Sequence, residues 1–550
     1  EDVRPADVKE RELERRNAPI GLPLRLQDDS YLPTDTTSFY LQGIPVLTVF
    51  TGAHAVNPVT GEKELTLVSE AQEMAIGQKN YGPYRQAQGG DYVVEPELTR
   101  YVQTVGDRIA AVSDRKLPYE FEVLNDSTPN AWALPGGKIS INRGLLVELE
   151  TEAELAAVLA HEVVHAAARH SAQSIERGMF VQGALVAAGV ALGDSDYRDI
   201  GMLGAGIGGQ LAQQKYSRDA ETEADAYGMR YMRRAGYDPA AAVGLQETFV
   251  RLAEGGSSSW LAGLFASHPP SPQRVTANRA LLAQMGNPGG EIGRERYQRK
   301  IARIKRNKPA YDAYAEARAA LEKDDLKTAL RKVDEAIKIE PDEAAFYGLR
   351  GEIRTAQNRP KQALRDLDRA VALNPDYFRP LLQRGLTRRM VGATAGAARD
   401  LERSVALLPT AEGYLGLGRV AEARGQRDQA VAYLRKAATS QSGAGKQAGQ
   451  RLARLDLEQN PNRYLDAGLG LTKDGYLVVR VANNAPLAVE RVEVVVGRRS
   501  GSGVRSGQAI GLNGRIGPGQ RAAVRTKIGP IDGATARRLG AVVTSASLVD

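Results

Sequence analysis

The sequence predicts a multidomain, mainly helical protein that ends in a small all-β domain. Residues 151–165 combine a helix start with an apolar face. In the second half of the chain three prolines recur every 34 residues, at Pro341, Pro375 and Pro409. The final 90 residues contain β-branched runs instead. We therefore expect an α+β domain, then an α-solenoid, then a β-rich module.

The composition agrees with an extracytoplasmic protein but does not establish that location. At 550 residues the chain is long enough for three or four domains, and 42% hydrophobic content is enough for packed cores. It contains no Cys, so we expect neither a disulfide nor a thiolate metal site. Glu1 in place of Met indicates either a removed signal peptide or an artificial start. These features agree with an extracytoplasmic location.

Two further features bear on partners. No stretch reaches the ~18 apolar residues of a membrane span. The nearest, residues 179–192 and 200–211, are expected to form a helical hairpin near the functional site, with contact to a membrane surface as the alternative. Much of the net charge of +7 lies in residues 294–308, which we interpret as a solvated linker helix; lipid headgroups or an acidic partner are alternatives. No nucleic-acid-binding pattern is present, so no nucleic acid partner is expected.

The strongest chemical signal is the segment His161-Glu162-Val163-Val164-His165. Residues i and i+4 of a helix share one face, so both imidazoles can reach a single zinc ion. Glu162 lies about 100° around the helix and can take a proton from a zinc-bound water. These are the parts that peptide-bond hydrolysis needs. With five His in the chain, a chance match on a core helix is expected roughly once in several hundred such chains.

A second predicted helix supplies a third ligand. Ser217 is a suitable N-cap for a helix whose first turns are acidic. Glu221 and Asp225 share a face, so Glu221 can bind the zinc while Asp225 accepts an imidazole N–H. Glu223 points elsewhere and is expected to be solvated. Candidates for stabilising the oxyanion are Arg218 and Arg274, although each is equally suited to a structural salt bridge.

Three motifs together resemble the M48 metallopeptidases: HEVVH, SRDAETEAD (217–225) and NAWALPGG (130–137). The likeness is strongest to the soluble periplasmic branch with tetratricopeptide repeats, typified by BepA. It implies a zincin-type α+β metalloprotease domain with one Zn2+ per chain. The residues that it assigns are the zinc ligands His161, His165 and Glu221, the general base Glu162, and Asp225 as the partner of a ligating imidazole.

The resemblance also points to His268, in the loop SHPPSPQR (267–274). If His268 binds the zinc, it completes a four-ligand shell and displaces the water that Glu162 needs, so the enzyme rests in a latent state. The alternative is a loop histidine that hydrogen-bonds a neighbour or contacts substrate. His170 and His54 are predicted not to bind, because His170 lies nine residues from His161, about 180° around the helix, and His54 lies in the opening segment.

A small sheet is expected beside the metal site. Residues 121–124 and 138–141 carry strand signals. The sheet edge is predicted near Ala131, Trp132, Ala133 and Leu134, where an extended substrate could add as a strand. Core packing is the plainer role for Trp132 and Leu134, and it is compatible with strand addition at the same edge.

The 34-residue period is that of the tetratricopeptide repeat. Ala329 and Ala363 occupy equivalent small-residue positions, and turns are expected at 324–325, 358–359 and 425–426. Three repeats and a partial fourth fit, and their groove is expected to hold peptides or partner proteins. In the last region, segments 476–481, 489–496 and 539–545 read as strands of a small antiparallel sandwich, an interaction module.

The expected domains are an extended segment (1–66), the metalloprotease domain (67–290), a basic linker helix (291–308), tetratricopeptide repeats (309–460) and a β-sandwich-like module (461–550). The expected function is a zinc metalloendopeptidase of the cell envelope. Its resemblance implies protein quality control, with unfolded or misassembled envelope proteins as substrates. The competing hypothesis is a chaperone or assembly adaptor with a latent protease site.

Overall fold

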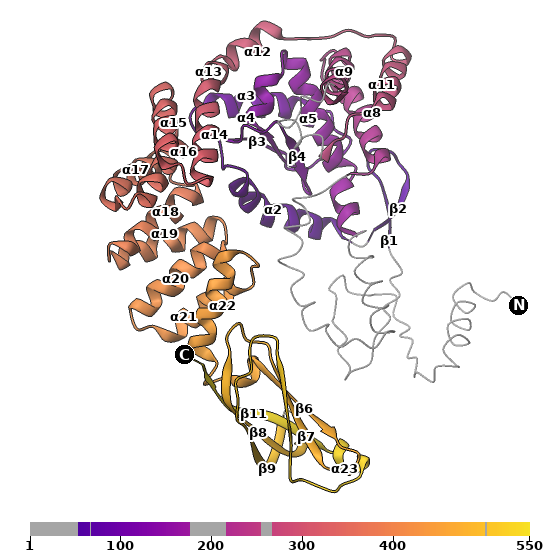
Figure 1. Ribbon diagram of the computed structural model, residues 1–550. Helices are drawn as coiled ribbons and strands as arrows, with labels where there is room; N and C mark the ends of the chain where they lie inside the picture. Colours follow the sequence, from indigo (N-terminus) through magenta and orange to yellow (C-terminus); the bar gives the residue numbers. More distant parts are fainter. Residues whose placement is uncertain (1–52, 67, 177–215, 255–266, 501–502, 550) are drawn as a thin grey trace, which may run out of the picture.

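The computed structural model describes residues 53–66, 68–176, 216–254, 267–500 and 503–549 (Figure 1). The expected helical hairpin at 179–192 and 200–211 lies outside the described residues, as does most of the opening segment. Within the described ranges no helix has both the length and the apolarity to cross a membrane.

The protease region is built from helices around a three-stranded sheet, with a separate two-stranded sheet formed by its first two strands. Its elements are β1 (Ala53–Val56), β2 (Lys63–Thr66), α2 (Glu70–Ala87), α3 (Pro96–Ala110), β3 (Glu120–Leu124), β4 (Ala131–Leu134), β5 (Lys138–Asn142), α4 (Arg143–Glu148), α5 (Glu152–Ala167), α8 (Arg218–Arg234), α9 (Ala240–Glu254) and α11 (Pro272–Gln284). The sheet has the order β3-β5-β4, in which β5 pairs parallel with β3 and antiparallel with β4. The two predicted strands therefore exist, and β4 lies at an edge as expected.

Helices α5 and α8 carry the motif residues, and each begins where the sequence predicts. The side chains of Thr151 and Ser217 cap the two helices by accepting backbone N–H groups of Glu154 and Ala220. The helices pack closely at Gly228, where an added β-carbon would lie 3.4 Å from the backbone nitrogen of His161. The small residue thus brings α8 against the motif turn of α5.

The solenoid consists of four helix pairs and a final single helix. These are α14 (Lys308–Glu322) with α15 (Leu326–Ile339), α16 (Ala344–Ala356) with α17 (Pro360–Leu373), α18 (Phe378–Met390) with α19 (Thr394–Leu407), α20 (Ala411–Ala423) with α21 (Arg427–Ala438), and α22 (Gly443–Asp456). The expectation of three repeats and a partial fourth was therefore one pair short. The turn prediction is confirmed: Asp324, Asn358 and Gly425 adopt positive φ between paired helices.

The basic segment before the solenoid packs one face into the protein, so its interpretation as a solvated linker helix is correct only for its exposed basic residues, which include Arg299, Lys300 and Arg306. It forms two short helices, α12 (Arg294–Lys300) and α13 (Ala302–Arg306). Tyr297, Ile301 and Ile304 are fully buried. Arg296 pairs with Glu152 and Glu291, while Arg303 lies 3.1 Å from Glu340. Part of the positive charge is thus neutralised within the chain.

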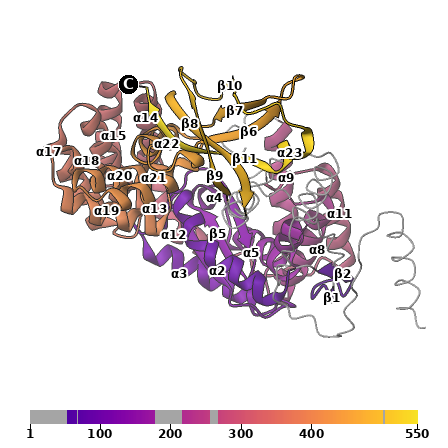
Figure 2. The same ribbon diagram turned by 90° about the horizontal axis from the view of Figure 1, so that it is seen from below.

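The solenoid and the protease region share a continuous hydrophobic core. Tyr311 and Phe346 of the first two helix pairs belong to the same buried cluster as Leu159 of α5. Farther along, the Gln86 side chain donates to the carbonyl of Asp376 and accepts the N–H of Phe378. The repeats consequently lie along one side of the protease region, with α8, α9 and α11 on the other side in both views (Figures 1 and 2).

The C-terminal module is a sandwich of two three-stranded antiparallel sheets, as predicted. Its elements are the 3-10 turn η2 (Pro461–Arg463), β6 (Leu465–Leu471), β7 (Leu477–Asn483), β8 (Val489–Ser500), β9 (Gly503–Leu512), β10 (Arg521–Arg525), α23 (Gly533–Arg537) and β11 (Leu539–Leu548). The sheet orders are β10-β7-β6 and β11-β8-β9. Strands β6, β9 and β10 were not predicted because they lack strong β-branched runs. Val479 and Val494, from the two sheets, share one core.

Candidate metal centre

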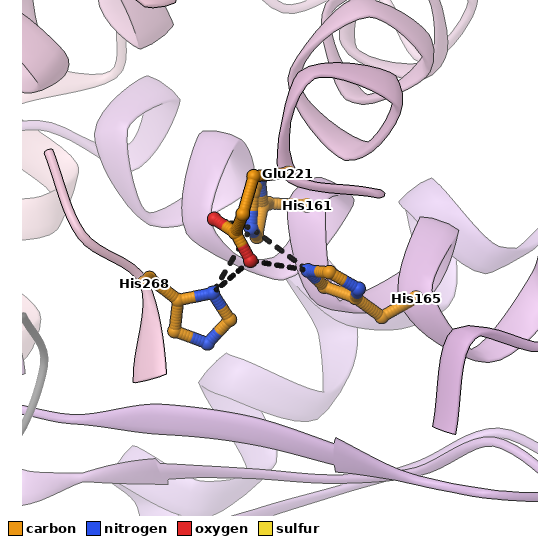
Figure 3. A group of neighbouring side chains, drawn as sticks. All are labelled: His161, His165, Glu221 and His268. Carbon is orange, nitrogen blue, oxygen red and sulfur yellow. Dashed lines mark hydrogen bonds and ion pairs between the residues drawn. The ribbon is translucent and has the colours of Figure 1, made fainter. Parts of the chain in front are cut away.

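Four side chains from three separate segments converge on one point (Figure 3). Nε2 of His161 lies 3.0 Å from Nε2 of His165 and 3.3 Å from Nδ1 of His268. The carboxylate of Glu221 lies 3.4 Å from His165 Nε2, 3.5 Å from His161 Nε2 and 3.0 Å from His268 Nδ1. The structure therefore brings together all four residues that the sequence marks as ligands or as the candidate fourth ligand.

These separations fit a metal ion with nitrogen and oxygen ligands. Ligand bonds of about 2.0 to 2.1 Å in a tetrahedron place neighbouring donor atoms about 3.3 Å apart, close to the observed range of 3.0 to 3.5 Å. His165 and Glu221 are almost completely buried, so their donor atoms have little access to water. A group of this kind can hold a metal, and its three imidazoles and one carboxylate suit zinc chemically.

The face of His161 turned away from the group is held by Asp225. Oδ1 of Asp225 lies 3.0 Å from His161 Nδ1, and Arg274 binds both carboxylate oxygens of Asp225 at 2.7 Å. Arg274 Nη1 also lies 2.8 Å from Glu221 Oε2. Arg274 is thus engaged in ion pairs with Asp225 and Glu221, as expected of its structural role. Arg218 is exposed on the first turn of α8, outside this group.

The electrostatics of the centre follow from burial and from these pairs. Burial alone would raise the pKa of Asp225, but Arg274 and His161 lower it to about 2. Asp225 is therefore ionised and favours the tautomer of His161 in which Nδ1 carries the hydrogen and Nε2 faces the other donors. Burial lowers the pKa of His165 and raises that of Glu162. For Glu221, the nearby imidazoles outweigh burial and hold the pKa far below its ordinary value.

His165 has two neighbours that sequence reasoning missed. The ring of Tyr216 stacks on its imidazole with centroids 3.8 Å apart, and His170 Nδ1 lies 2.9 Å from His165 Nδ1. The expectation that His170 lies on the far side of the same helix was wrong, because α5 ends at Ala167 and Arg169 adopts a φ of 62°. His170 then starts a new helical segment and folds back, outside the four-donor group but against one of its members.

Glu223 and His54 are the remaining acid and histidine for which the sequence predicts a position. Glu223 was expected to be solvated, yet its side chain is only 23% exposed and lies 3.4 Å from His170 Nε2. The prediction of a solvated side chain was wrong because His170 packs against the side of α8 that carries Glu223. The backbone of His54 lies in β1, and its side chain falls outside the described part of the chain.

Glu162 lies beside the four-donor group on the side of His268. Its Oε1 lies 3.5 Å from His268 Nε2, and its Oε2 is buried without a hydrogen-bond partner in the described structure. The His268 ring therefore directs its Nδ1 toward the other donor residues, which Figure 3 labels, and its Nε2 toward Glu162. A carboxylate oxygen without a partner at this position is available to a water molecule or a substrate.

Strand β4 offers only part of its edge to a substrate. Because Asn142 donates to the carbonyl of Asn130, the antiparallel pairing directs the backbone groups of Ala131 and Ala133 toward the free edge. The carbonyl of Ala133 already accepts from Ser171 at 3.1 Å and Tyr216 at 3.3 Å. Among the described residues neither edge group of Ala131 has a partner. Ala131 is itself fully buried, so a substrate strand can pair with it only after the residues that cover it move aside.

The side chains of the edge strand mostly belong to the core. Trp132 meets the rings of Tyr81 and Tyr84 edge to face and donates to Gln88, and Leu134 is buried in the same cluster. Core packing is therefore their role. Any contact of β4 with a substrate is made through its backbone and through Ala131.

A small apolar cavity of about 50 Å³ adjoins the centre. Its mouth includes His161, Glu162 and His268. Its walls come from three helices and are mainly aliphatic or aromatic, with Ala157, Val158, Ala224, Met229, Met232, Leu245 and Phe249. The cavity can take one apolar side chain of modest size next to the reacting group.

The family comparison covers this centre. The model described as "Peptidase family M48" matches residues 96–281, which include all four donor residues. The mitochondrial metalloendopeptidase OMA1 of Schizosaccharomyces pombe is 41% identical over 179 residues, 32% of this chain and 51% of that protein. The putative beta-barrel assembly-enhancing protease of Vibrio cholerae is 33% identical over 200 residues, 34% of this chain and 40% of that protein. The matched part therefore spans about half or less of these relatives.

A shorter relative is matched over most of its length. Metalloprotease YcaL of Escherichia coli is 31% identical over 186 residues, 34% of this chain and 69% of that protein. Among solved structures, the Arabidopsis OM64 TPR domain aligns with 22% of this chain and 98% of its own, at 20% identity and a TM-score of 0.21. On the family match and the likeness to YcaL, this chain belongs to peptidase family M48.

Proposed function

We propose that this protein is a zinc-dependent endopeptidase of the periplasm that acts in protein quality control. The observation that carries the proposal is the convergence of His161, His165, Glu221 and His268, with the unpartnered Glu162 carboxylate beside them. One Zn2+ per chain is held by the first three residues, with His268 as a fourth ligand in the resting state. Asp225 and Arg274 orient the ligands.

A zinc held by His161, His165 and Glu221 would supply Lewis acidity for the scissile carbonyl and for the attacking water. Glu162 takes the proton of the attacking water on a carboxylate oxygen and returns it to the leaving amine. Because burial raises the pKa of Glu162, its carboxyl is suited to carrying that proton. His268 must leave the donor group first, since a fourth protein ligand occupies the position that water needs.

Substrate binding is proposed for the β4 edge and the adjoining cavity. The substrate strand pairs with the backbone of Ala131 and places an apolar side chain between Val158, Met229 and Leu245. Further pairing at Ala133 requires Ser171 and Tyr216 to release its carbonyl. Pairing at Ala131 meets no competing hydrogen bond among the described residues, but it requires the buried strand to be uncovered first.

The biological role is proposed from the relatives and the solenoid. One relative is named a beta-barrel assembly-enhancing protease, so misassembled envelope proteins are the proposed substrates. The repeats, whose stacked helices present a concave face, hold substrates or partner proteins. A periplasmic location belongs to the same proposal.

The second candidate function is a chaperone or assembly adaptor with a latent protease site. The observation that favours it is His268, which makes the donor group complete without water. Cleavage of an unfolded protein such as casein by the full chain and by Glu162→Gln separates the two. We expect the unaltered protein to cut casein and Glu162→Gln to lose at least about 100-fold in rate while keeping its zinc. Stoichiometric zinc without cleavage by the unaltered protein supports the adaptor.

A further inference from the structure

Three arginines gather on the first helices of the last repeats, away from the metal centre. Arg389 lies on α18, Arg419 on α20 and Arg451 on α22. The helices α16, α18, α20 and α22 pack along one another in that order, so they form one face of the solenoid. Arg419 reaches across to Gln447 of α22 at 3.0 Å, and Arg451 reaches back to Glu422 of α20 at 2.7 Å. The three guanidinium groups therefore lie along one surface.

The positive charge of this cluster is not balanced. Glu422 pairs with Arg451, but in residues 308–456, all of which are described, no carboxylate forms an ion pair with Arg389 or Arg419. The Nε atoms of both residues are buried and have no hydrogen-bond partner. Burial and the charges of Arg419 and Arg451 lower the pKa of Arg389. These groups lie close enough to repel one another.

Neighbouring arginines of the same solenoid, in contrast, form ion pairs. Arg384 on α18 lies 2.8 Å from Asp400 and 2.9 Å from Asp368, and Arg388 lies 2.8 Å from Asp400. The preceding repeat has the same arrangement between its own arginines and aspartates. In these two repeats these arginines thus form ion pairs with aspartates, whereas Arg389 and Arg419 form none with any described residue.

We infer that Arg389, Arg419 and Arg451 form an anion site that binds carboxylate groups of an acidic peptide segment. Guanidinium forks match carboxylates in shape and charge, and a bound carboxylate would balance charge that the described residues of the solenoid leave without an ion pair. A face of stacked repeats accommodates an extended chain, which favours a peptide over a flat lipid surface. The inference rests on the proposed role of the repeats in holding clients, and it adds the chemical class of the segment held.

The test is fluorescence anisotropy with the full chain carrying Glu162→Gln, so that the probe is not cut. The probe is a labelled (Asp-Ser)5 peptide with an amidated C-terminus. We expect it to bind, and we expect Arg389→Gln and Arg419→Gln each to weaken binding about tenfold, the effect of one charge-assisted hydrogen bond. The matched control is Arg399→Gln, an exposed arginine of α19 without an ion pair, which should keep the affinity within about twofold.

Two further probes identify the source of the carboxylate. An (Asn-Ser)5 amide should not bind, and (Asn-Ser)5 with a free C-terminal carboxylate should bind only if the site takes a chain terminus. Equal affinity for the Asp and Asn amides, binding of anionic vesicles in preference to the Asp peptide, or equal losses in Arg389→Gln and Arg399→Gln would overturn the inference. Hydrolysis of an uncharged quenched peptide by the unaltered chain is measured separately. If no hydrolysis is observed, the proposed peptidase function is contradicted, while the peptide-binding result can still be interpreted.

Discussion

Arg274 binds Asp225 through two parallel hydrogen bonds, Nε to Oδ2 and Nη2 to Oδ1, each 2.7 Å long. Asp225 in turn lies 3.0 Å from His161 Nδ1, so a buried chain of charges runs from α11 through α8 to α5. This pair fixes which nitrogen of His161 faces the donor group. Its removal should weaken metal binding without removing a ligand.

The first prediction therefore concerns Asp225→Asn. The amide lacks the charge that supports His161, so zinc affinity should fall roughly 10- to 100-fold. Competition with a chelator of known affinity measures the change. Asp219→Asn, an exposed acid on the same helix, is the control and should leave the affinity unchanged. Loss of affinity in both variants to the same degree would contradict a specific role for Asp225.

The second prediction concerns His268→Ala. If His268 is the fourth ligand of a latent state, its removal opens the water position, and hydrolysis of a short peptide should increase several-fold with zinc retained. Gln273→Ala, an exposed neighbour on α11, should behave like the unaltered protein. An equal or lower rate with unchanged zinc content would show instead that His268 serves the substrate or only the local structure.

The third prediction tests the apolar cavity. Ala157 forms part of its wall, so Ala157→Phe should fill it. We expect kcat/KM for peptides with Leu next to the scissile bond to fall about tenfold or more, while peptides with Gly at that position change little. The Gly peptide is the internal control. A uniform fall for both peptides would mean that the substitution disturbs the centre and not the selection of a side chain.

The fourth prediction concerns pH and stability. Burial raises the pKa of Glu122 to about 7, with Asp91 adding to the rise and Arg85 opposing it. Since the unfolded chain has the ordinary value of 4.5, the folded protein binds this proton more tightly. The stabilisation is complete below about pH 4.5 and is lost as pH rises through about 7.

The Glu122→Gln substitution removes this pH-dependent loss of stability, because the glutamine amide is neutral at every pH. The variant should be more stable than the unaltered protein at pH 8, by roughly 1 to 3 kcal/mol, with a smaller difference at pH 5. Thermal unfolding at the two pH values measures it, with Glu97→Gln on the surface as control. The same shift at both pH values would contradict the assignment.

Local signals were enough to predict most of the centre. The caps Thr151 and Ser217, the i and i+4 spacing of His161 and His165, and the shared face of Glu221 and Asp225 are properties of single helices. The repeats could be predicted because the sequence itself repeats with a regular period. In each case the interaction that decides the structure lies within a few residues.

Long-range packing could not be predicted in this way. His170 meets His165 only because Arg169 takes a left-handed conformation, where it is held by a buried ion pair with Glu73 of α2, 2.9 Å away. Tyr216 stacks on His165 from another segment. One face of the basic run before the solenoid is buried because Tyr297 enters a core shared with the protease region. None of these contacts leaves a pattern in the local sequence.

The most direct test of the account is the zinc K-edge X-ray absorption of the purified full chain, together with its zinc content by mass spectrometry. We expect about one zinc per chain, surrounded by four nitrogen or oxygen donors at about 2.0 to 2.1 Å. The imidazole contribution should fall from three to two in His268→Ala, and the zinc should be lost in Glu221→Ala. A protein that binds no zinc, or whose zinc is unaffected by Glu221→Ala, would contradict the central claim.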